Sequence, residues 1–309
     1  KKQFLRTHNR VCCSLESLHF LDNWKPDLII IDECQAMLTQ HTCVTTNGIH
    51  LDANITLFKQ MILDKDTKLI WADAFLGQKT MNFIKNLNIP THIYNYKCKM
   101  EPREAIEIVP TKKKDLDCML SILCESLDKG EKNYVYVSSK DRLVKYWLPL
   151  LREKYPDKKF MVYTSTDKSS LKNVREDWST CDAVLVTSTI TVGINYDIPD
   201  YFHNIFIYAT RASGNKIADI FQSHYRVRHI INNRLYFFID ERNMGYKETN
   251  RFQINQDFKW REDAFIQQTS HFIKCDPYIQ ELVIDNDYES NMSARYIRPM
   301  FNYFLRECN

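Results

Sequence analysis

Glycine is scarce in this chain, with six residues among 309. Average usage of about 7% would give roughly twenty. No two of these glycines lie close enough together to form a loop that cradles phosphate, and none is followed by lysine. A P-loop of the GxxxxGK[ST] type is therefore excluded within the printed sequence.

Paired cysteines and long apolar runs are also missing. The ten cysteines form no CxxC pair and no cluster with histidine at zinc spacing, so we expect no structural zinc ion. Their scattered pattern indicates a reducing, intracellular compartment. No apolar run approaches the roughly 18 residues of a membrane span, and no signal peptide opens the chain. A membrane is therefore not an expected partner.

The chain carries no large excess of charge, since its formal net charge is +3. Any surface that binds nucleic acid must therefore be local. Hydrophobic residues make up 44% and charged residues 26%, which is typical of a globular protein. The length suits two domains of roughly 100–200 residues each. Because the chain opens at Lys1 without methionine, we expect it to be part of a longer protein.

Short apolar runs alternate with segments of helical periodicity. We expect strands at residues 27–32, 68–74, 92–94, 133–137, 160–163, 183–187, 205–208 and 235–239. We expect helices at residues 55–63, 78–87, 116–127, 143–154 and 216–228. This alternation predicts an α/β fold made of parallel βαβ units. The polar stretch 101–117 is typical of a linker, so we expect domains at residues 1–110 and 111–244 and a mainly helical C-terminal extension at 245–309.

Two acids, Asp32 and Glu33, follow the first predicted strand. Ligands of open α/β sheets bind outside the carboxyl ends of the strands. A nucleoside triphosphatase needs two acids there, one to hold Mg²⁺ and one to orient the attacking water. Acids at the start of a helix also suit the helix dipole, which requires no catalysis.

The second half of the chain holds two further segments of interest. Residues 184–195 end a strand in hydroxyl side chains and a glycine, and such hydroxyls suit a phosphate contact. A threonine-rich strand followed by a turn has the same composition. Residues 219–228 place Arg226 and Arg228 at the end of a predicted helix. These cations either stabilise the helix terminus or reach a γ-phosphate.

Together these segments resemble motifs of superfamily 2 helicases, and more narrowly those of the herpesvirus-type replication origin-binding helicases of large DNA viruses. Residues 32–35, Asp-Glu-Cys-Gln, resemble motif II, and residues 72–74 lie at the place of motif III. Residues 189–194 resemble motif V, residues 222–228 motif VI, and residues 13–19 the motif Ib region. The resemblance covers roughly residues 11–240 and keeps the motif order of the family.

The resemblance implies two RecA-like domains, the first truncated at its N-terminus, that bind ATP and Mg²⁺ between them and drive movement on DNA or its unwinding. Asp32 would hold Mg²⁺, Glu33 would activate water, and Arg226 and Arg228 would stabilise the transferring charge. Four residues would contact the nucleotide: Gln35, Gly193, Asn195 and Gln222. The implied partners are DNA and other viral replication proteins, in the host nucleus or at a cytoplasmic viral replication site.

The chain departs from the family pattern in several places. Tyr225 stands where the family motif VI has glycine, and Arg228 is offset by one from the common helicase spacing. Arg226 and Arg228 would leave one helix about 200° apart, so the helix must stop near Tyr225 or only one arginine serves the nucleotide. We expect Arg226, which shares a face with Gln222. In the family the P-loop lies upstream, so we expect the chain alone to lack most ATP affinity.

Nucleic-acid contacts are expected from polar side chains at strand ends and in the motif Ib segment. The candidates are Ser14, Ser17, His19, Ser139, Lys140, Thr164, Thr187 and Thr189. Contacts to phosphate give affinity without reading sequence. Polar strand-to-helix connections have the same composition, and the preference for DNA over RNA follows from the resemblance alone.

Two other classes of function stay open. A non-catalytic, helicase-like scaffold that binds nucleic acid within a viral replication complex would fit the missing P-loop and Tyr225. A metal-dependent nuclease would use Asp32, Glu33 and Asp73, and it predicts further acids at neighbouring strand ends.

Overall fold

The computed structural model describes residues 7–96, 102–110, 117–166, 173–190, 194–242, 245–264 and 276–308. The chain divides into two compact units. Unit 1 combines Lys1–Asn95 with Glu248–Glu289, and unit 2 combines Tyr96–Lys247 with Ser290–Asn309. The segment expected to be a C-terminal extension is therefore shared between the two units.

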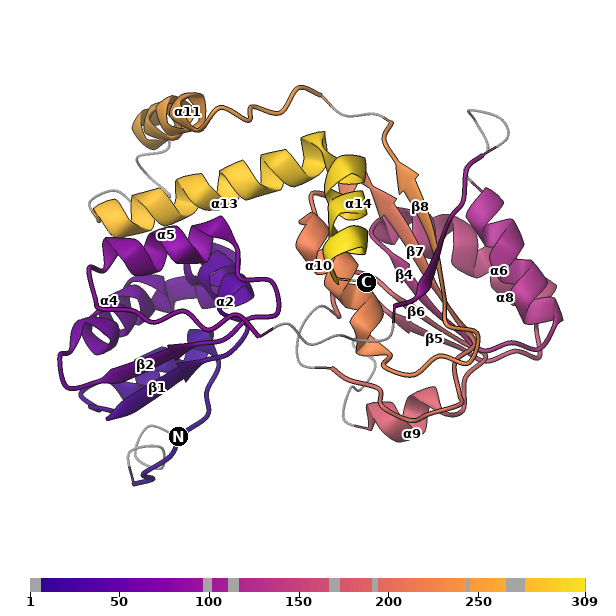
Figure 1. Cartoon of the computed structure of the whole chain (residues 1–309), viewed down its shortest axis with the longest axis horizontal. Coiled ribbons are helices and arrows are strands. Elements are labelled where there is room, and N and C mark those ends of the chain that lie inside the picture. Colours follow the sequence, from indigo (N-terminus) through magenta and orange to yellow (C-terminus); the bar gives the residue numbers. More distant parts are fainter. Residues whose placement is uncertain are drawn as a thin grey trace. The chain divides into compact units, whose positions relative to one another are not determined.

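Unit 1 contains two parallel strands, β1 (Leu28–Ile31) and β2 (Lys68–Trp71), with Leu28 opposite Lys68 and Ile31 opposite Trp71 (Figure 1). Its helical elements are η1 (Leu15–Leu21), α2 (Cys34–His41), α3 (Val44–Asn47), η2 (Gly48–His50), α4 (Leu51–Leu63), α5 (Gln78–Asn86), α11 (Arg251–Ala264) and the first part of α13 (Pro277–Arg295).

The core of unit 1 fixes the end of β1. Helix α4 buries Phe58 and Ile62 because apolar residues recur along it at helical spacing. Leu38 of α2 and Ile31, the last residue of β1, belong to the same buried cluster. The strand end that precedes the acid pair is therefore anchored by packing.

The strand expected at residues 92–94 is absent from the structure, and that prediction was wrong. Residues 91–96 have no regular secondary structure. Ile93 is 61% exposed and Tyr94 is 91% exposed. Two apolar residues in a row carry too little pattern to distinguish a strand from an exposed loop.

Unit 2 is built on a six-stranded parallel sheet with the order β3-β8-β7-β4-β6-β5 (Figure 1). The strands are β3 (Glu104–Glu107), β4 (Asn133–Val137), β5 (Phe160–Tyr163), β6 (Ala183–Val186), β7 (Asn204–Thr210) and β8 (Arg234–Asp240). In the centre of the sheet, Asn133 of β4 lies between Ala183 of β6 and Asn204 of β7. Every residue of β4, β6 and β7 is buried, as expected for strands covered on both faces.

Helices accompany the sheet of unit 2. They are α6 (Cys118–Asp128), α7 (Lys140–Arg142), the π-helical η3 (Leu143–Trp147), α8 (Leu148–Lys154), α9 (Val174–Trp178), η4 (Arg211–Ser213), α10 (Ile217–Gln222), η5 (Ser223–Arg226) and α14 (Ile297–Cys308). Among the described residues of both units, no helix is long and apolar enough to cross a bilayer.

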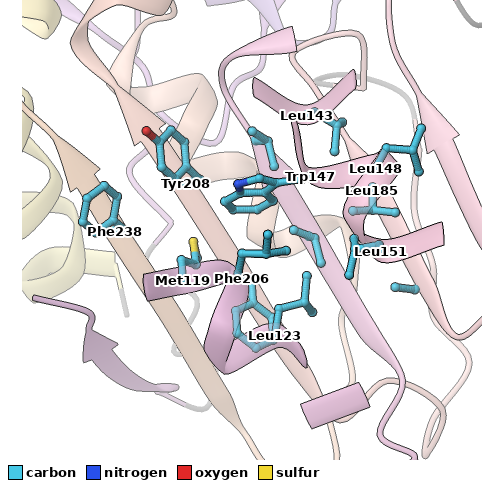
Figure 2. Packing of buried hydrophobic residues seen from close by; sticks show 14 of the residues in the cluster. Met119, Leu123, Leu143, Trp147, Leu148, Leu151, Leu185, Phe206, Tyr208 and Phe238 are labelled. Carbon is cyan, nitrogen blue, oxygen red and sulfur yellow. The ribbon is translucent and has the colours of Figure 1, made fainter. Parts of the chain in front are cut away.

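Alternate residues of β4 supply two different apolar layers. Val135 and Val137 belong to a core cluster with helices α6 and α8, and Figure 2 shows Trp147 in the middle of this cluster. Tyr134 faces an aromatic cluster that includes Trp178 and Phe202, at ring-centroid distances of 5.7 and 6.4 Å. Alternating side chains of a strand point to opposite faces, so this central strand joins both layers of the core.

The stretch expected to be a linker, residues 101–117, contains strand β3, and that prediction was wrong. Glu104 pairs with Arg234 and Glu107 with Phe237 of β8. β3 lies at the edge of the sheet and the side chain of Glu104 is 62% exposed. An edge strand with exposed carboxylates lacks the apolar run that marks a buried strand.

The helix expected at residues 216–228 is shorter than predicted. Helix α10 ends at Gln222, a 3₁₀ turn continues to Arg226, and Val227 is extended. Of the two alternatives for the arginines, the structure therefore shows the one in which the helix stops near Tyr225. A bridge between Tyr196 and Val227 draws the chain out of the helix.

Candidate nucleotide-binding and nucleic-acid-binding sites

The acid pair lies at the carboxyl end of β1. Asp32 is exposed, and its Oδ1 accepts the backbone N–H of Glu33 at 3.0 Å. Glu33 adopts a left-handed backbone conformation, with φ 51° and ψ 47°, just before α2 begins. Such a conformation is strained for a residue with a side chain, and strain of this kind concentrates at functional sites. An exposed carboxylate in this place suits Mg²⁺, which prefers oxygen ligands.

Asp73 lies beside the acid pair, but both of its carboxylate oxygens accept hydrogen bonds from backbone N–H groups. Its Oδ2 accepts the N–H of Gln35 and its Oδ1 accepts the N–H of Phe75, both at 2.8 Å. The described residues contain no group of three or more His, Cys, Asp or Glu side chains that could hold a metal ion. The further acids that a nuclease would need are not found there.

Gln35, expected to contact the nucleotide, is engaged within unit 1. Its Nε2 donates to Glu289 at 2.6 Å, and its Oε1 accepts the hydroxyl of Thr80 at 2.5 Å. Gly77 makes room for it, since a Cβ at that position would lie 2.6 Å from the Gln35 Nε2. A nucleotide contact by this side chain stays a prediction, and it would require Gln35 to leave these partners.

The motif VI segment follows α10. Gln222 ends this helix and is half-buried, and so is Arg226, whose Nη1 donates to the carbonyl of Ile194 at 3.4 Å. Arg228 is exposed. Arg226 therefore contacts the motif V segment, whereas the side chain of Arg228 lies at the surface.

The motif V segment is described in part. Gly193 lies outside the described residues, and Asn195 is exposed. Tyr196 donates its backbone N–H to the carbonyl of Arg226 at 2.7 Å, and its own carbonyl accepts the N–H of Arg228 at 3.1 Å. Tyr196, two residues after motif V, is thus joined to the motif VI segment by backbone hydrogen bonds.

The motif Ib residues lie in η1 of unit 1 and just before it. Ser14 precedes this 3₁₀ helix, is exposed, and donates its hydroxyl to that of Ser17 at 3.4 Å. The ring of His19 stacks on His50 with a centroid distance of 3.8 Å. The backbone N–H of His19 donates to Asn54 at 2.8 Å, so a buried amide fixes the turn.

Five of the expected nucleic-acid contacts gather at one edge of the sheet of unit 2. They follow three adjacent strands, with Ser139 and Lys140 after β4, Thr187 and Thr189 after β6, and Thr164 after β5. We call these five residues the hydroxyl edge. Parallel strands end at the same edge of a sheet, so side chains that are distant in sequence meet there.

Hydrogen bonds tie the hydroxyl edge together. Lys140 Nζ donates to Ser165 at 3.1 Å, and this bond joins the end of β4 to that of β5. Thr187 donates to the carbonyl of Tyr163 at 3.3 Å and lies 3.1 Å from the hydroxyl of Thr189. Thr164 and Thr187 are buried, so the accessible members of the hydroxyl edge are Ser139, Lys140 and Thr189.

The profile of a protein family described as "Origin of replication binding protein" matches residues 97–268, more than half of the chain. The chain belongs to this origin-binding family. The resemblance to herpesvirus-type helicases noted in the motifs is thereby confirmed.

Relatives of the origin-binding chain come from large DNA viruses. It is 25% identical over 240 residues to the "Replication origin-binding protein" of human herpesvirus 6A, which covers 75% of this chain and 30% of that protein. It is 24% identical over 204 residues to the "Putative helicase/primase complex protein" of African swine fever virus strain Badajoz 1971, which covers 62% of this chain and 18% of that protein. The chain thus spans less than a third of the length of these relatives.

Solved structures with a similar fold include two of the yeast protein Dbp5. "S. cerevisiae Dbp5 bound to RNA and ADP BeF3" matches with a TM-score of 0.51 and 14% identity, covering 89% of this chain and 67% of that one. A variant of the same protein with the same ligands gives 0.52 and 12% identity, covering 94% and 67%. At such identity the likeness shows the fold, and it confirms the RecA-like α/β architecture of the origin-binding chain.

Two buried cations of this family member, Lys79 beside Gln35 and Arg103 beside the motif VI segment, were not identified from the sequence. Lys79 is 1% exposed and donates to the carbonyl of Gln35 at 2.7 Å. Arg103 is 6% exposed and donates to carbonyl groups of the motif VI segment. Lys79 lies in the first turn of α5 and Arg103 directly precedes β3, and burial distinguishes both from the other lysine and arginine residues that the structure describes.

Proposed function

We propose that the chain is the motor portion of a viral replication helicase that hydrolyses ATP with Mg²⁺ to move on or unwind DNA. The observation that carries this proposal is the hydroxyl edge, where Lys140 and two accessible hydroxyl groups end adjacent parallel strands in a chain of the origin-binding family. Such a row of donors suits the phosphates of one nucleic-acid strand.

The nucleotide chemistry is assigned to the acid pair and to motif VI. Asp32, exposed at a strand end, suits the role of holding Mg²⁺, and Glu33 that of orienting the attacking water. The Mg²⁺ ion, when bound, would neutralise charge that develops on the phosphates. Gln222 and Arg226 are assigned to the nucleotide because Arg226 contacts the motif V segment, and Arg228 is in second place.

DNA and other viral replication proteins are the proposed partners. The names of the herpesvirus and African swine fever virus relatives support this assignment. The scattered cysteines, which form no CxxC pair, suit a reducing, intracellular site of action, in the host nucleus or at a cytoplasmic replication site.

Binding of the 309-residue chain to single-stranded oligothymidine, followed by fluorescence anisotropy at several salt concentrations, tests the nucleic-acid role. Lys140→Ala should weaken binding about fivefold or more and reduce the salt slope by about 0.7, the share of one phosphate contact on a single strand. Loss of a hydroxyl in Thr189→Val should weaken binding less, because a neutral donor contributes less than a charged one.

Lys145→Ala provides the matched control. Lys145 is 63% exposed, lies five residues further along the same segment and pairs with Asp141 at 2.9 Å. It should leave affinity and salt slope nearly unchanged. Equal effects of the Lys140 and Lys145 substitutions would show general charge attraction and would contradict the assignment of the hydroxyl edge. Tighter binding to oligouridine than to oligothymidine would contradict the choice of DNA.

A further inference from the structure

The carbonyl groups at the end of η5 accept hydrogen bonds from Arg103, a residue distant in sequence. The last carbonyls of a helix have no partner within it. Arg103, 121 positions before His224, donates Nη1 to the carbonyl of His224 and Nη2 to that of Val227, both at 2.6 Å. Nη2 also lies 3.4 Å from the carbonyl of Arg228. The planar fork of one guanidinium thus spans the end of the 3₁₀ turn.

The Arg103 side chain remains a cation in this buried place. Burial lowers the pKa of Arg103 to about 10, which leaves it protonated at neutral pH. A buried charge is costly unless it is hydrogen-bonded, and a cation at a helix C-terminus also gains from the helix dipole. The Arg103 guanidinium carbon lies 5.4 Å from the centre of the Tyr225 ring, a cation–π contact. Tyr225, which replaces the family's glycine, therefore has a packing partner.

The neighbouring His224 adds no second positive charge. Burial lowers the pKa of His224 well below 6.5, and Arg103 lowers it further. Its Nδ1 contacts the carbonyl of Phe221. The neutral ring and the charged guanidinium are therefore compatible side by side.

The same segment is also held by Tyr196, two residues after motif V. The backbone of Tyr196 bonds to the carbonyl of Arg226 at 2.7 Å and to the N–H of Arg228 at 3.1 Å. Residues 226–228 lie between these bonds and the Arg103 fork. The hydrogen bonds of Tyr196 and Arg103 together restrict the backbone conformation of Arg226.

We propose that Arg103 is a positioning residue that aims Arg226 at the nucleotide by holding the carbonyl groups at the end of η5. The proposal rests on the function proposed above. Lysine would keep the charge but lose the two-pronged geometry, so Arg103→Lys removes the fork with little change in charge.

Hydrogen exchange on the 309-residue chain tests the structural half of this proposal. In Arg103→Lys the amide of Arg228 should exchange at least about tenfold faster, because its bond to Tyr196 opens more often. Arg234→Met is the control, since Arg234 is exposed and pairs with Glu104, the residue after Arg103. It should leave the Arg228 amide unchanged. If Arg103→Lys fails to fold, Arg103→Gln, which keeps one donor group, takes its place. Unchanged exchange in the folded variant would overturn the proposal.

ATP turnover by the longer protein tests the catalytic half. Arg103→Lys should lower kcat at least about tenfold and leave KM for ATP within about threefold. Combined with Arg226→Ala, it should cause no loss beyond that of Arg226→Ala alone, because both remove one contribution. If the kcat loss of the double variant equals the product of the two single losses, Arg103 acts independently of Arg226, and the proposal is overturned. If Arg226→Ala alone keeps full turnover, the proposed nucleotide role is wrong, while the exchange result still decides whether Arg103 holds the segment.

Discussion

At the scale of single residues, buried polar groups define the surroundings of the proposed nucleotide site. Lys79 donates to the carbonyl of Gln35 at 2.7 Å and to Thr39 at 2.5 Å, and it lies 3.5 Å from the carboxylate of Glu289. Glu289 in turn accepts from Gln35 at 2.6 Å. Gln35 is therefore held by partners in α2, α5 and α13 of unit 1.

Replacing Lys79 by methionine should lower the free energy of unfolding of unit 1 by about 3 kcal/mol, because the largely buried carboxylate of Glu289 loses its neighbouring cation. Urea unfolding of the 309-residue chain measures this loss. Lys85→Met is the matched control on the same helix, where the lysine is exposed, and it should change stability by about 0.5 kcal/mol or less. Equal losses in the two variants would show that the Lys79 network contributes nothing specific.

His41 makes the stability of unit 1 depend on pH. It is 1% exposed, and burial lowers its pKa to about 4. Below pH 6.5 His41 is protonated in the unfolded chain but stays neutral in the folded chain until the pH approaches 4. The free energy of unfolding therefore falls as the pH drops from 6.5 towards 4, and His41 does not affect it at higher pH. At pH 5 the loss should be about 2 kcal/mol.

Urea unfolding at pH 7 and pH 5, with wild type and His41→Leu compared, measures this share. The variant should lose about 2 kcal/mol less between the two pH values than the wild type does. Other buried groups, including His224, titrate in both proteins and cancel in the comparison. The same pH dependence in both proteins would contradict the assignment to His41.

At the scale of elements, apolar runs predicted most of the parallel strands. β4 and β6 consist entirely of buried residues, so their composition alone distinguishes them from loops. The edge strand β3 was not predicted because its two glutamates, of which Glu104 is exposed, give the segment the polar composition of a linker. The early end of α10 depends on the Tyr196 bridge and on Arg103, both remote in sequence. Local pattern carries no information on such partners.

The candidate site was predictable to a similar degree. The place of Asp32 and Glu33 after a strand follows from local pattern, and so do the polar ends of β4, β5 and β6. The burial of Thr164 and Thr187 does not, because it depends on which strands are neighbours. The roles assigned to these residues in catalysis and binding stay predictions.

The break between α10 and η5 leads to a prediction about the two arginines. Arg226 contacts the motif V segment and Arg228 lies exposed, so Arg226→Ala should reduce ATP turnover of the longer protein by about 10³-fold if it meets the transferring phosphate. Arg228→Ala should reduce it much less. Steady-state ATPase assays, with DNA affinity as a check on folding, measure both. A larger kinetic loss in Arg228→Ala would reverse the assignment.

At the scale of the whole molecule, the chain comprises two units with separate sheets and cores. The acid pair and motif Ib belong to unit 1, whereas motifs V and VI and the hydroxyl edge belong to unit 2. The resemblance to superfamily 2 helicases implies the same division of motifs between two RecA-like domains. We propose that ATP hydrolysis and DNA binding by these units are coupled.

The most direct test of this coupling is to measure ATP hydrolysis by the longer protein with and without single-stranded DNA. The wild type is compared with Glu33→Gln. The substitution keeps the shape of the side chain and removes its charge, so the variant should bind ATP as before and lose nearly all turnover. The wild type should hydrolyse ATP faster when DNA is present. Full turnover in Glu33→Gln would remove Glu33 from catalysis, and a wild type with DNA binding but no ATP hydrolysis would contradict the motor and favour a non-catalytic scaffold.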